Sequence, residues 1–231
     1  MKRFYKSVAV EETPEGFRFL LDGKPVRTPH GRRPFFLPSR ALAETLKEEW
    51  LAQGEDMWPA SMPLTRLANT VLDGTASARE EMVEAILRFG DNDLLSYRAD
   101  HPRELALNQR QWDAWLDWAW DRYGARLAVT KGVAPIGQSP EALAAFRQAI
   151  EACDDFALIA LHVLSSVTGS LTLGLAALEG LLTPARAFAL SRLDETYQAE
   201  KWGADREALE RSRRLALEME NAVRLVRLAR T

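Results

Sequence analysis

The sequence predicts an α+β fold, in which a small N-terminal antiparallel β domain precedes a larger, all-α helical domain. Two observations support this class. Before Ser39, short apolar–polar alternations are separated by glycine and proline, as in strands joined by turns. After Ser39, apolar residues recur every three to four positions, which is the period of a helix. We expect residues 1–60 to form the β-rich domain with its first helix and residues 61–231 to form the helical domain.

Three or four short strands are predicted in the N-terminal region. They are expected within residues 7–11, 17–21, 25–28 and 35–37. A turn at residues 14–16 joins the first two, and Asp22-Gly23 is typical of a two-residue hairpin turn after the second. A sheet this small is not stable alone, so another element must cover its apolar face.

Helices are predicted where a capping residue precedes a helical apolar pattern. Ser39 can cap the first helix, and Ser77-Ala78-Arg79-Glu80 reads as a capping box. Pro102 can begin a long helix that Gly124 ends. The expected helices cover residues 39–53, 64–72, 77–89, 102–124, 139–153, 184–202 and 205–230, with an extended connector at residues 125–138.

Residues 156–178 contain no Asp, Glu, Lys or Arg and are long enough to span a bilayer. Serine, threonine and His162 interrupt this stretch, however, and Thr168-Gly169-Ser170 is typical of a break between two helices. We therefore expect a buried helix hairpin and no membrane insertion.

Composition excludes several classes of protein. The 231 residues include 30 Lys and Arg against 33 Asp and Glu, so the basic excess of a nucleic-acid-binding protein is missing. Cys153 is the single cysteine, which excludes an internal disulfide and favours a reducing compartment. The N-terminal residues lack the pattern of a signal or transit peptide. We expect a cytoplasmic bacterial protein, or the matrix equivalent in organellar relatives.

Motifs for cofactors, metals and catalysis are missing from the sequence. No G-x-G-x-x-G loop occurs, and Gly169 and Gly174 have phosphate-loop spacing without the following Lys-Ser/Thr. The three histidines are far apart, so we expect no metal site and no cofactor. One enzymatic alternative stays open, a small hydrolase using His162 with Ser165, which lie one helical turn apart, or the carboxylate of Glu195.

Aromatic side chains in two predicted helices occupy unusual positions. In helix 102–124, Trp118 lies off the main apolar stripe, so it is either packed between two layers or exposed as a binding anchor. In helix 184–202, Phe188, Glu195 and Trp202 fall on one side. A carboxylate in an aromatic strip needs a cation, either Arg192 one turn earlier or a partner's group.

Blocks distributed over almost the whole chain resemble those of the ATP12 family, assembly chaperones of the F1 sector of ATP synthase. Each block alone is weakly specific, but their order and spacing make the resemblance strong. They are Arg3-Phe4-Tyr5-Lys6 with Val8 and Val10, Leu21-Asp22-Gly23-Lys24-Pro25-Val26 with Thr28-Pro29, Glu48-Glu49-Trp50, Met62-Pro63-Leu64-Thr65-Arg66-Leu67-Ala68-Asn69-Thr70, Asp93-Leu94-Leu95-Ser96-Tyr97-Arg98, Thr168-Gly169-Ser170, Asp194-Glu195-Thr196-Tyr197-Gln198 and Lys201-Trp202-Gly203.

The resemblance implies a chaperone without enzymatic activity that binds the unassembled F1-ATPase α subunit, without ATP, and shields the surface that later meets the β subunit. It also implies a monomer when free and no nucleic-acid partner. Glu195 lies in a matching block and in an aromatic setting, and it is the residue we most expect to contact the partner. The full set of expected partner-binding residues is Glu195, Asp194, Trp202, Phe188, Trp118 and Trp50.

Overall fold

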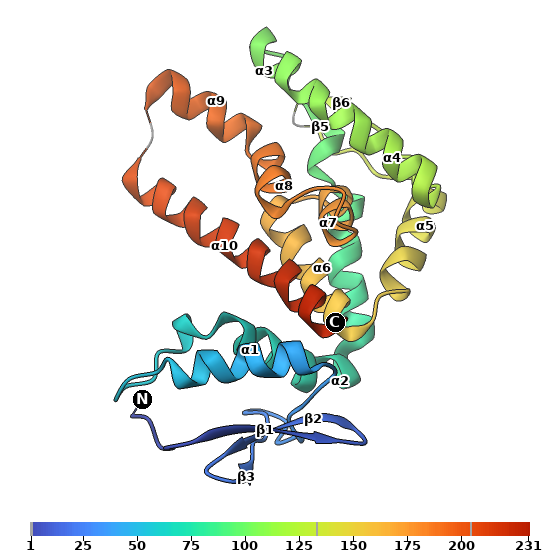
Figure 1. The fold of residues 1–231 in the computed structure, drawn as a ribbon. Helices are drawn as coiled ribbons and strands as arrows, with labels where there is room; N and C mark the ends of the chain where they lie inside the picture. Colours follow the sequence, from blue (N-terminus) through green and yellow to red (C-terminus); the bar gives the residue numbers. More distant parts are fainter. Residues whose placement is uncertain (1, 133, 204) are drawn as a thin grey trace. The chain divides into compact units, whose positions relative to one another are not determined.

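The computed structural model describes residues 2–132, 134–203 and 205–231, with residues 75–77 described by their backbone alone. The chain divides into two compact units (Figure 1). Unit 1 comprises Met1–Arg79 and Asn221–Thr231, and unit 2 comprises Glu80–Glu220. The predicted α+β class is confirmed, since a small antiparallel sheet precedes a larger helical part. Residue 60, the expected domain limit, lies inside unit 1, and that limit stays a prediction.

The sheet of unit 1 has four strands, which are β1 (Val8–Thr13), β2 (Gly16–Leu21), β3 (Lys24–Pro25) and β4 (Phe36–Leu37). The order is β1-β2-β3, and β4 also pairs with β2. Both predicted turns are confirmed. Asp22 and Gly23 have φ values of 47° and 74°, the left-handed conformation that a tight hairpin turn requires. Gly16 is required for a steric reason, because a Cβ there would lie 2.6 Å from the Leu37 carbonyl oxygen.

Helix α1 (Arg40–Leu51) covers the apolar face of this sheet, as the sequence required (Figure 1). The Ser39 side chain caps it by accepting a hydrogen bond from the Leu42 amide, so the predicted cap is confirmed. Leu42, Ala43 and Leu46 are buried on its inner face. Aromatic rings complete this core, with Phe19 packed 5.9 Å from Phe35 between ring centroids.

Helix α2 (Pro63–Asp91) covers both helices predicted at residues 64–72 and 77–89. Its two helical segments are joined across a kink at Ala78, where φ is −132° and ψ is 21°. The break therefore lies just inside the second predicted helix, a few residues later than the sequence indicated. The capping box had assigned a role to Ser77, whose side chain lies outside the described residues.

Two further predicted helices are broken in unit 2. The long helix at residues 102–124 consists of α3 (Arg103–Asn108), a 3₁₀ segment at Gln109–Trp112, and α4 (Asp113–Tyr123). In a 3₁₀ turn, residues three apart eclipse each other, which lets Gln109 and Trp112 both point inward. The helix at residues 184–202 consists of α8 (Pro184–Ser191) and α9 (Leu193–Trp202), with the break at Arg192 (φ −116°, ψ 23°).

The predicted apolar hairpin is confirmed as α6 (Asp155–Thr168) and α7 (Leu171–Leu178). Gly169 ends α6 with φ of 68°, and Ser170 caps α7. The two helices approach so closely that a Cβ at Gly174 would lie 2.5 Å from Ser165 Oγ. Within the described ranges, no helix combines the length and the apolar character needed to cross a membrane.

The remaining elements complete the two units. Helix α5 (Pro140–Glu151) begins at the predicted cap Ser139, and its inner face joins α6 and α7 in the core of unit 2. Helix α10 (Arg206–Ala229) agrees with the predicted last helix. The connector at residues 125–138 was expected to be extended; it also carries β6 (Thr130–Lys131), which pairs in parallel with β5 (Tyr97–Arg98). Short 3₁₀ segments lie at Pro59–Ser61 and Leu94–Ser96.

Candidate protein-binding groove

An open groove of about 630 Å³ lies in unit 2, between α8 and α9 on one side and the first half of α10 on the other. Its apolar lining includes Phe188, Ala199 and Trp202 from the first wall and Leu209 and Leu215 from the second. Polar and charged groups from both walls accompany them. The groove therefore combines an apolar centre with charges, the composition of a surface that docks another protein.

The aromatic strip predicted from the sequence lines this groove. Glu195, Ala199 and Trp202 follow the i, i+4, i+7 spacing of one helix face on α9. Phe188 reaches the same groove from α8, although the chain breaks between the two helices. Trp202 occupies the last turn of α9, which Gly203 ends, and its side chain is 78% exposed. An indole this exposed has most of its surface available for contact.

Leu209 forms part of the opposite wall. Its helical spacing places it on the same apolar side of α10 as Met219 and Val226. Met219 is fully buried, whereas Leu209 is 47% exposed. The apolar face of α10 is therefore covered only in its later part, and its beginning stays open along the groove.

Glu195 is paired within the chain, as one of its two interpretations predicted. Its carboxylate accepts a hydrogen bond of 2.8 Å from Arg192 Nη1 and remains 58% exposed. Arg192 also donates from Nη2 to the Val167 carbonyl oxygen at 2.7 Å, and its guanidinium lies 5.2 Å from the Phe188 ring centroid. Arg192 thus holds Glu195, the end of α6 and Phe188 together at the break between α8 and α9.

Asp194 faces a different part of the surface from Glu195, as expected for neighbours on a helix. It accepts a hydrogen bond of 2.8 Å from Gln109 Nε2 and is half-buried. It lines a second hollow, of about 390 Å³, together with Trp112 and other residues. Arg192, Glu195 and Gln198 line both hollows.

Trp118 and Trp50 lie away from the groove. Trp118 is half-buried against the core of unit 2, and its ring meets Tyr123 edge-on at 5.4 Å. Trp50 belongs to unit 1, where its ring packs 5.3 Å from Tyr5 and 5.8 Å from Phe19. Both placements are those of packing residues, and a partner-binding role for either stays a prediction.

The residues of the hydrolase alternative lack a catalytic arrangement. Ser165 is fully buried, and its hydroxyl has no hydrogen-bond partner within the described chain. A nucleophilic serine needs a base within hydrogen-bond reach, which His162 does not supply here. Burial lowers the pKa of His162, which favours its neutral form. Among the described residues, no three His, Cys, Asp or Glu side chains gather closely enough to hold a metal ion.

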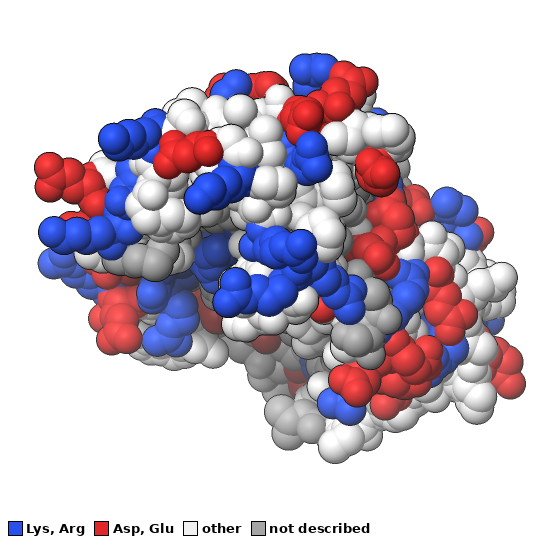
Figure 2. Space-filling model, turned by 90° about the horizontal axis from the view of Figure 1, so that it is seen from below, with Lys and Arg blue, Asp and Glu red and all other residues white. Residues whose placement is uncertain are grey.

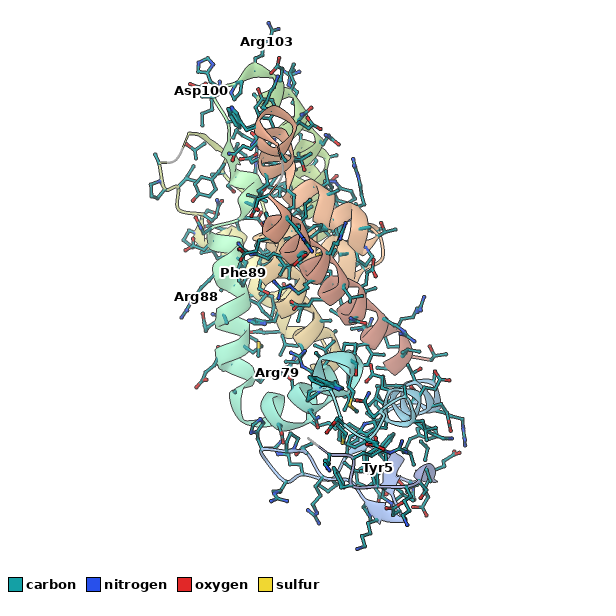
Figure 3. The ribbon with its side chains drawn as sticks, turned by 90° about the vertical axis from the view of Figure 1, so that its left-hand side faces the viewer. Tyr5, Arg79, Arg88, Phe89, Asp100 and Arg103 are labelled. Carbon is teal, nitrogen blue, oxygen red and sulfur yellow. The ribbon has the colours of Figure 1, made fainter. Side chains whose placement is uncertain are left out.

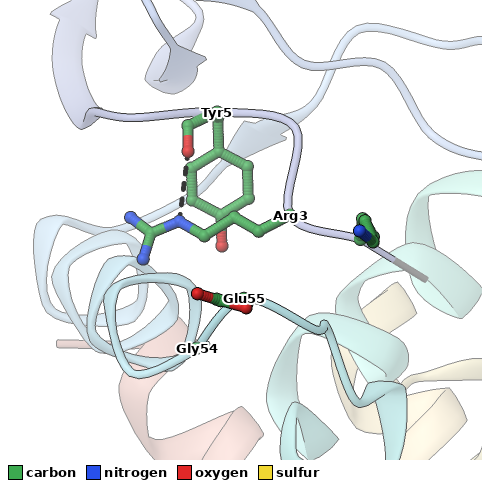
Figure 4. Close-up of a pocket in the computed structure, with 5 residues that line it drawn as sticks. Arg3, Tyr5, Gly54 and Glu55 are labelled. Carbon is green, nitrogen blue, oxygen red and sulfur yellow. Dashed lines mark hydrogen bonds between the residues drawn. The ribbon is translucent and has the colours of Figure 1, made fainter.

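A small hollow of unit 1, about 410 Å³, is formed where the N-terminal segment meets the loop after α1 (Figure 4). Arg3 donates from Nε to the Tyr5 carbonyl oxygen at 3.1 Å and from Nη1 to the Gln53 carbonyl oxygen at 2.8 Å. The Tyr5 hydroxyl donates to the Trp50 carbonyl oxygen at 2.6 Å. These polar groups already bond one another. The hydrogen bonds around this hollow therefore hold the N-terminal segment in place.

Several blocks that resemble the ATP12 family have structural roles that the sequence did not reveal. Glu49 accepts hydrogen bonds from the Leu64 and Thr65 amides at 2.9 and 2.8 Å, which caps the N-terminus of α2. Asp93 is fully buried and accepts hydrogen bonds from the Leu95 and Thr172 amides, both at 3.0 Å. These carboxylates fix turns, and nothing in the linear sequence distinguishes them from Glu195.

An open groove with an exposed tryptophan and a paired carboxylate on a helical frame has the features of a surface that docks another protein. Comparison with known proteins makes the class specific. Residues 2–120 match the family described as ATP12 chaperone protein. The chain belongs to the ATP12 chaperone family, which implies a role as an assembly chaperone.

Solved structures of similar proteins share the fold over nearly the whole chain. The structure of Atp12 from Paracoccus denitrificans is 41% identical, with a TM-score of 0.93 over 99% of this chain and 98% of that one. The Atu1473 protein from Agrobacterium tumefaciens is 48% identical, with a TM-score of 0.89 over 97% of this chain and 84% of that one. Mitochondrial protein atp12 of Schizosaccharomyces pombe is 25% identical over 227 residues, which cover 90% of this chain and 76% of the yeast protein.

Proposed function

We propose that this chain is an ATP-independent assembly chaperone that binds the unassembled F1-ATPase α subunit, shields its subunit-interface surface and releases it for F1 assembly. Membership of the ATP12 chaperone family supports the assembly role. The proposed binding site is supported by the groove of unit 2, where Trp202 is 78% exposed beside Glu195. This activity would take place where F1 is assembled, in the cytoplasm of a bacterium or the matrix of a mitochondrion.

The groove suits a chaperone that works without covalent chemistry. An unassembled subunit exposes an apolar interface, which is prone to aggregation. Phe188, Trp202 and Leu209 offer an apolar surface on which such an interface can dock. The Glu195 carboxylate, held by Arg192 at 2.8 Å yet 58% exposed, can set the register by attracting a cation of the client. An open surface of this kind can be displaced by the subunit's larger permanent interface.

The decisive experiment is capture of separately expressed F1 α and β subunits by the immobilised chain. We expect α to be retained and β not. Trp202→Ala should weaken capture of α about 30-fold or more, as truncation of a tryptophan hot spot does. Trp120→Ala is the matched control, because Trp120 is also exposed, at 49%, but lies outside the groove. The two variants should unfold at nearly the same temperature as the unmodified chain.

The charge in the groove is tested separately. Glu195→Lys should weaken capture of α while leaving the helical circular dichroism and the melting temperature near those of the unmodified chain. Glu200→Lys makes the same charge change on the same helix outside the groove, and capture should persist. Collapse of folding in Glu195→Lys would instead show that Glu195 is a structural ion-pair member. Equal capture by all four variants would place the binding surface elsewhere.

A further inference from the structure

The two units carry opposite net charges. Unit 1 contains 15 Lys and Arg against 10 Asp and Glu, whereas unit 2 contains 15 against 23. The excess of unit 1 is concentrated, because no Asp or Glu occurs between Gly23 and Ala43. Lys24, Arg27, Arg32 and Arg33 fall in the first half of this stretch. We call residues 24–34 the basic hairpin.

The basic hairpin is held in one conformation by hydrogen bonds made mainly by its backbone. The amides of His30 and Gly31 donate to the Asp73 carboxylate of α2 at 3.1 and 2.9 Å. Across the hairpin, the Thr28 amide donates to the Arg33 carbonyl oxygen at 2.9 Å, and the buried Thr28 hydroxyl accepts from the Arg33 amide at 3.0 Å. The contact is close, since a Cβ at Gly31 would lie 2.7 Å from Asp73 Oδ1 and would displace this carboxylate.

The cations of the hairpin are exposed and lack acidic partners. Lys24, Arg27 and Arg32 are exposed and Arg33 is half-buried. No ion pair within the described residues includes any of the four. Arg27 uses Nη1 to bond the Arg32 carbonyl oxygen at 2.9 Å, which brings its guanidinium to the tip of the hairpin. Viewed from the sheet side, the surface shows Lys and Arg side chains lying next to one another (Figure 2).

The like charges of the basic hairpin repel one another. Binding of an oppositely charged group relieves this repulsion, so the hairpin favours an anionic partner. Nucleic acid fits this surface poorly. Between Lys24 and Pro34 there is no Phe, Tyr or Trp on which a base could stack, His30 being the one aromatic residue of this stretch, and the chain as a whole is acidic, at −3. A carboxylate-rich protein segment fits well, because arginine forks and a lysine bind carboxylates directly.

We propose that the basic hairpin is a second docking surface, which binds an acidic segment of the client protein. This inference rests on the proposed function, because the client is taken to be the F1 α subunit. The groove would supply apolar contact and the hairpin would supply electrostatic attraction. Attraction of this kind raises the association rate more than it slows dissociation, and salt screens it.

The test is the association rate with isolated F1 α subunit at about 50 mM and about 300 mM NaCl. The reversed variant is Lys24→Glu with Arg27→Glu and Arg32→Asp; aspartate tolerates the positive φ of 53° at Arg32. We expect it to associate at least about tenfold more slowly at low salt and to lose most of the salt dependence. The neutral variant Lys24→Gln with Arg27→Gln and Arg32→Asn should lie between the two.

A matched control makes the same change of net charge in unit 2, through Arg88→Glu with Arg103→Glu and Arg110→Glu. Figure 3 labels Arg88 and Arg103. These three arginines are exposed and form no ion pair in the described chain. The control should associate within about twofold of the unmodified chain. Equal slowing of control and reversed variant would overturn the proposal, since overall charge would then explain the effect.

Further outcomes separate this inference from the proposed function. If the unmodified chain captures no α subunit, the proposed function fails, and binding of a glutamate-rich peptide, measured by fluorescence anisotropy, tests the hairpin alone. Peptide binding that the reversed variant loses supports docking at the basic hairpin, and absence of peptide binding contradicts it.

Tighter binding of duplex DNA or anionic vesicles than of the peptide overturns the proposal. So does a reversed variant that dimerises with undiminished capture, because the cations would then only protect the edge strand β3.

Discussion

Unit 1 closes its apolar core and exposes Phe4 and Trp58 outside it, whereas unit 2 gathers exposed apolar side chains along a groove. In unit 1, α1 covers the sheet and Phe19 is fully buried beneath it. In unit 2 the core around α6 and α7 is equally closed, but Trp202 and Leu209 remain exposed along the groove. Apolar recognition is therefore expected from unit 2, and the concentrated positive charge of unit 1 suits recognition of a different chemistry.

The units also differ in how they use carboxylates. In unit 1, Asp22 accepts hydrogen bonds from the Lys6 and Ser7 amides at the surface, and these bonds lower its pKa. In unit 2, Asp93 is fully buried, and desolvation raises its pKa despite the amides that bond it. Surface carboxylates of unit 1 hold loops in their charged form, while the buried carboxyl of unit 2 is pushed toward its neutral form.

Trp50→Ala should have the largest effect on stability and tests the closed core of unit 1. Loss of a ring packed against Tyr5 and Phe19 should lower the free energy of unfolding by about 4 kcal/mol. Urea unfolding followed by circular dichroism measures this change. Trp50→Phe is the control and should cost much less, because Trp50 Nε1 is buried and has no hydrogen-bond partner among the described residues. Reduced capture of F1 α by a fully stable Trp50→Phe variant would show that Trp50 contacts the partner.

Asp93→Ala tests the buried carboxyl of unit 2. It leaves the Leu95 and Thr172 amides without their acceptor, so we expect a loss of about 3 kcal/mol. The exposed Asp91, at the end of α2, provides the control, and Asp91→Ala should change stability by less than about 0.5 kcal/mol. Equal urea midpoints for both variants would contradict the role assigned to Asp93.

Local signals in the sequence were sufficient for most of the fold. The turn at Asp22-Gly23 and the cap at Ser39 follow from side-chain chemistry within a few residues, and both are confirmed. Errors arose where tertiary contacts override local pattern. The break at Arg192 carries no proline or glycine, and it is accompanied by the contacts of the Arg192 side chain with Val167 and Glu195. The kink of α2 at Ala78, in contrast, lies within residues predicted to begin a helix.

The groove could be predicted only in part. Helical spacing placed Phe188, Glu195 and Trp202 on one side, and all three line it. The opposite wall could not be foreseen, because spacing assigns Leu209 to an apolar face without showing where the covering element ends. The sequence likewise could not show that Trp118 packs on the core, since helical position does not reveal the neighbouring helices.

Acidification should affect the two kinds of carboxylate in opposite directions. Burial alone would raise the pKa of Asp73, but hydrogen bonds from Thr28, His30 and Gly31 lower it overall. Asp22 and Asp73 therefore contribute stability above their unfolded pKa of about 3.9, and lose it as pH falls through their lower folded values. The raised pKa of Asp93 works the other way, because its contribution is complete below about pH 3.9 and is lost as pH rises through the folded value.

Urea unfolding at several pH values between about 3 and 7 separates these contributions. Asp22→Asn with Asp73→Asn should lose less stability than the unmodified chain as pH falls below about 4. Asp93→Asn should gain stability relative to the unmodified chain as pH rises above about 4. Parallel pH profiles for all three proteins would show that these carboxyls keep their ordinary pKa values in the folded state.

Arg192→Lys should have the smallest effect on stability and defines the edge of the groove most sharply. Lysine keeps the charge but lacks the planar fork by which Nη1 and Nη2 of Arg192 reach Glu195 and Val167, so Glu195 loses its fixed position. Because this ion pair is partly exposed, we expect the free energy of unfolding to change by less than about 1 kcal/mol.

Capture of F1 α by Arg192→Lys should fall less than capture by Glu195→Lys, since the carboxylate remains. Combining Arg192→Lys with Glu195→Gln should weaken capture by less than the product of the two single effects, because arginine acts here through glutamate. Independent, multiplicative effects would mean that each side chain meets the client separately.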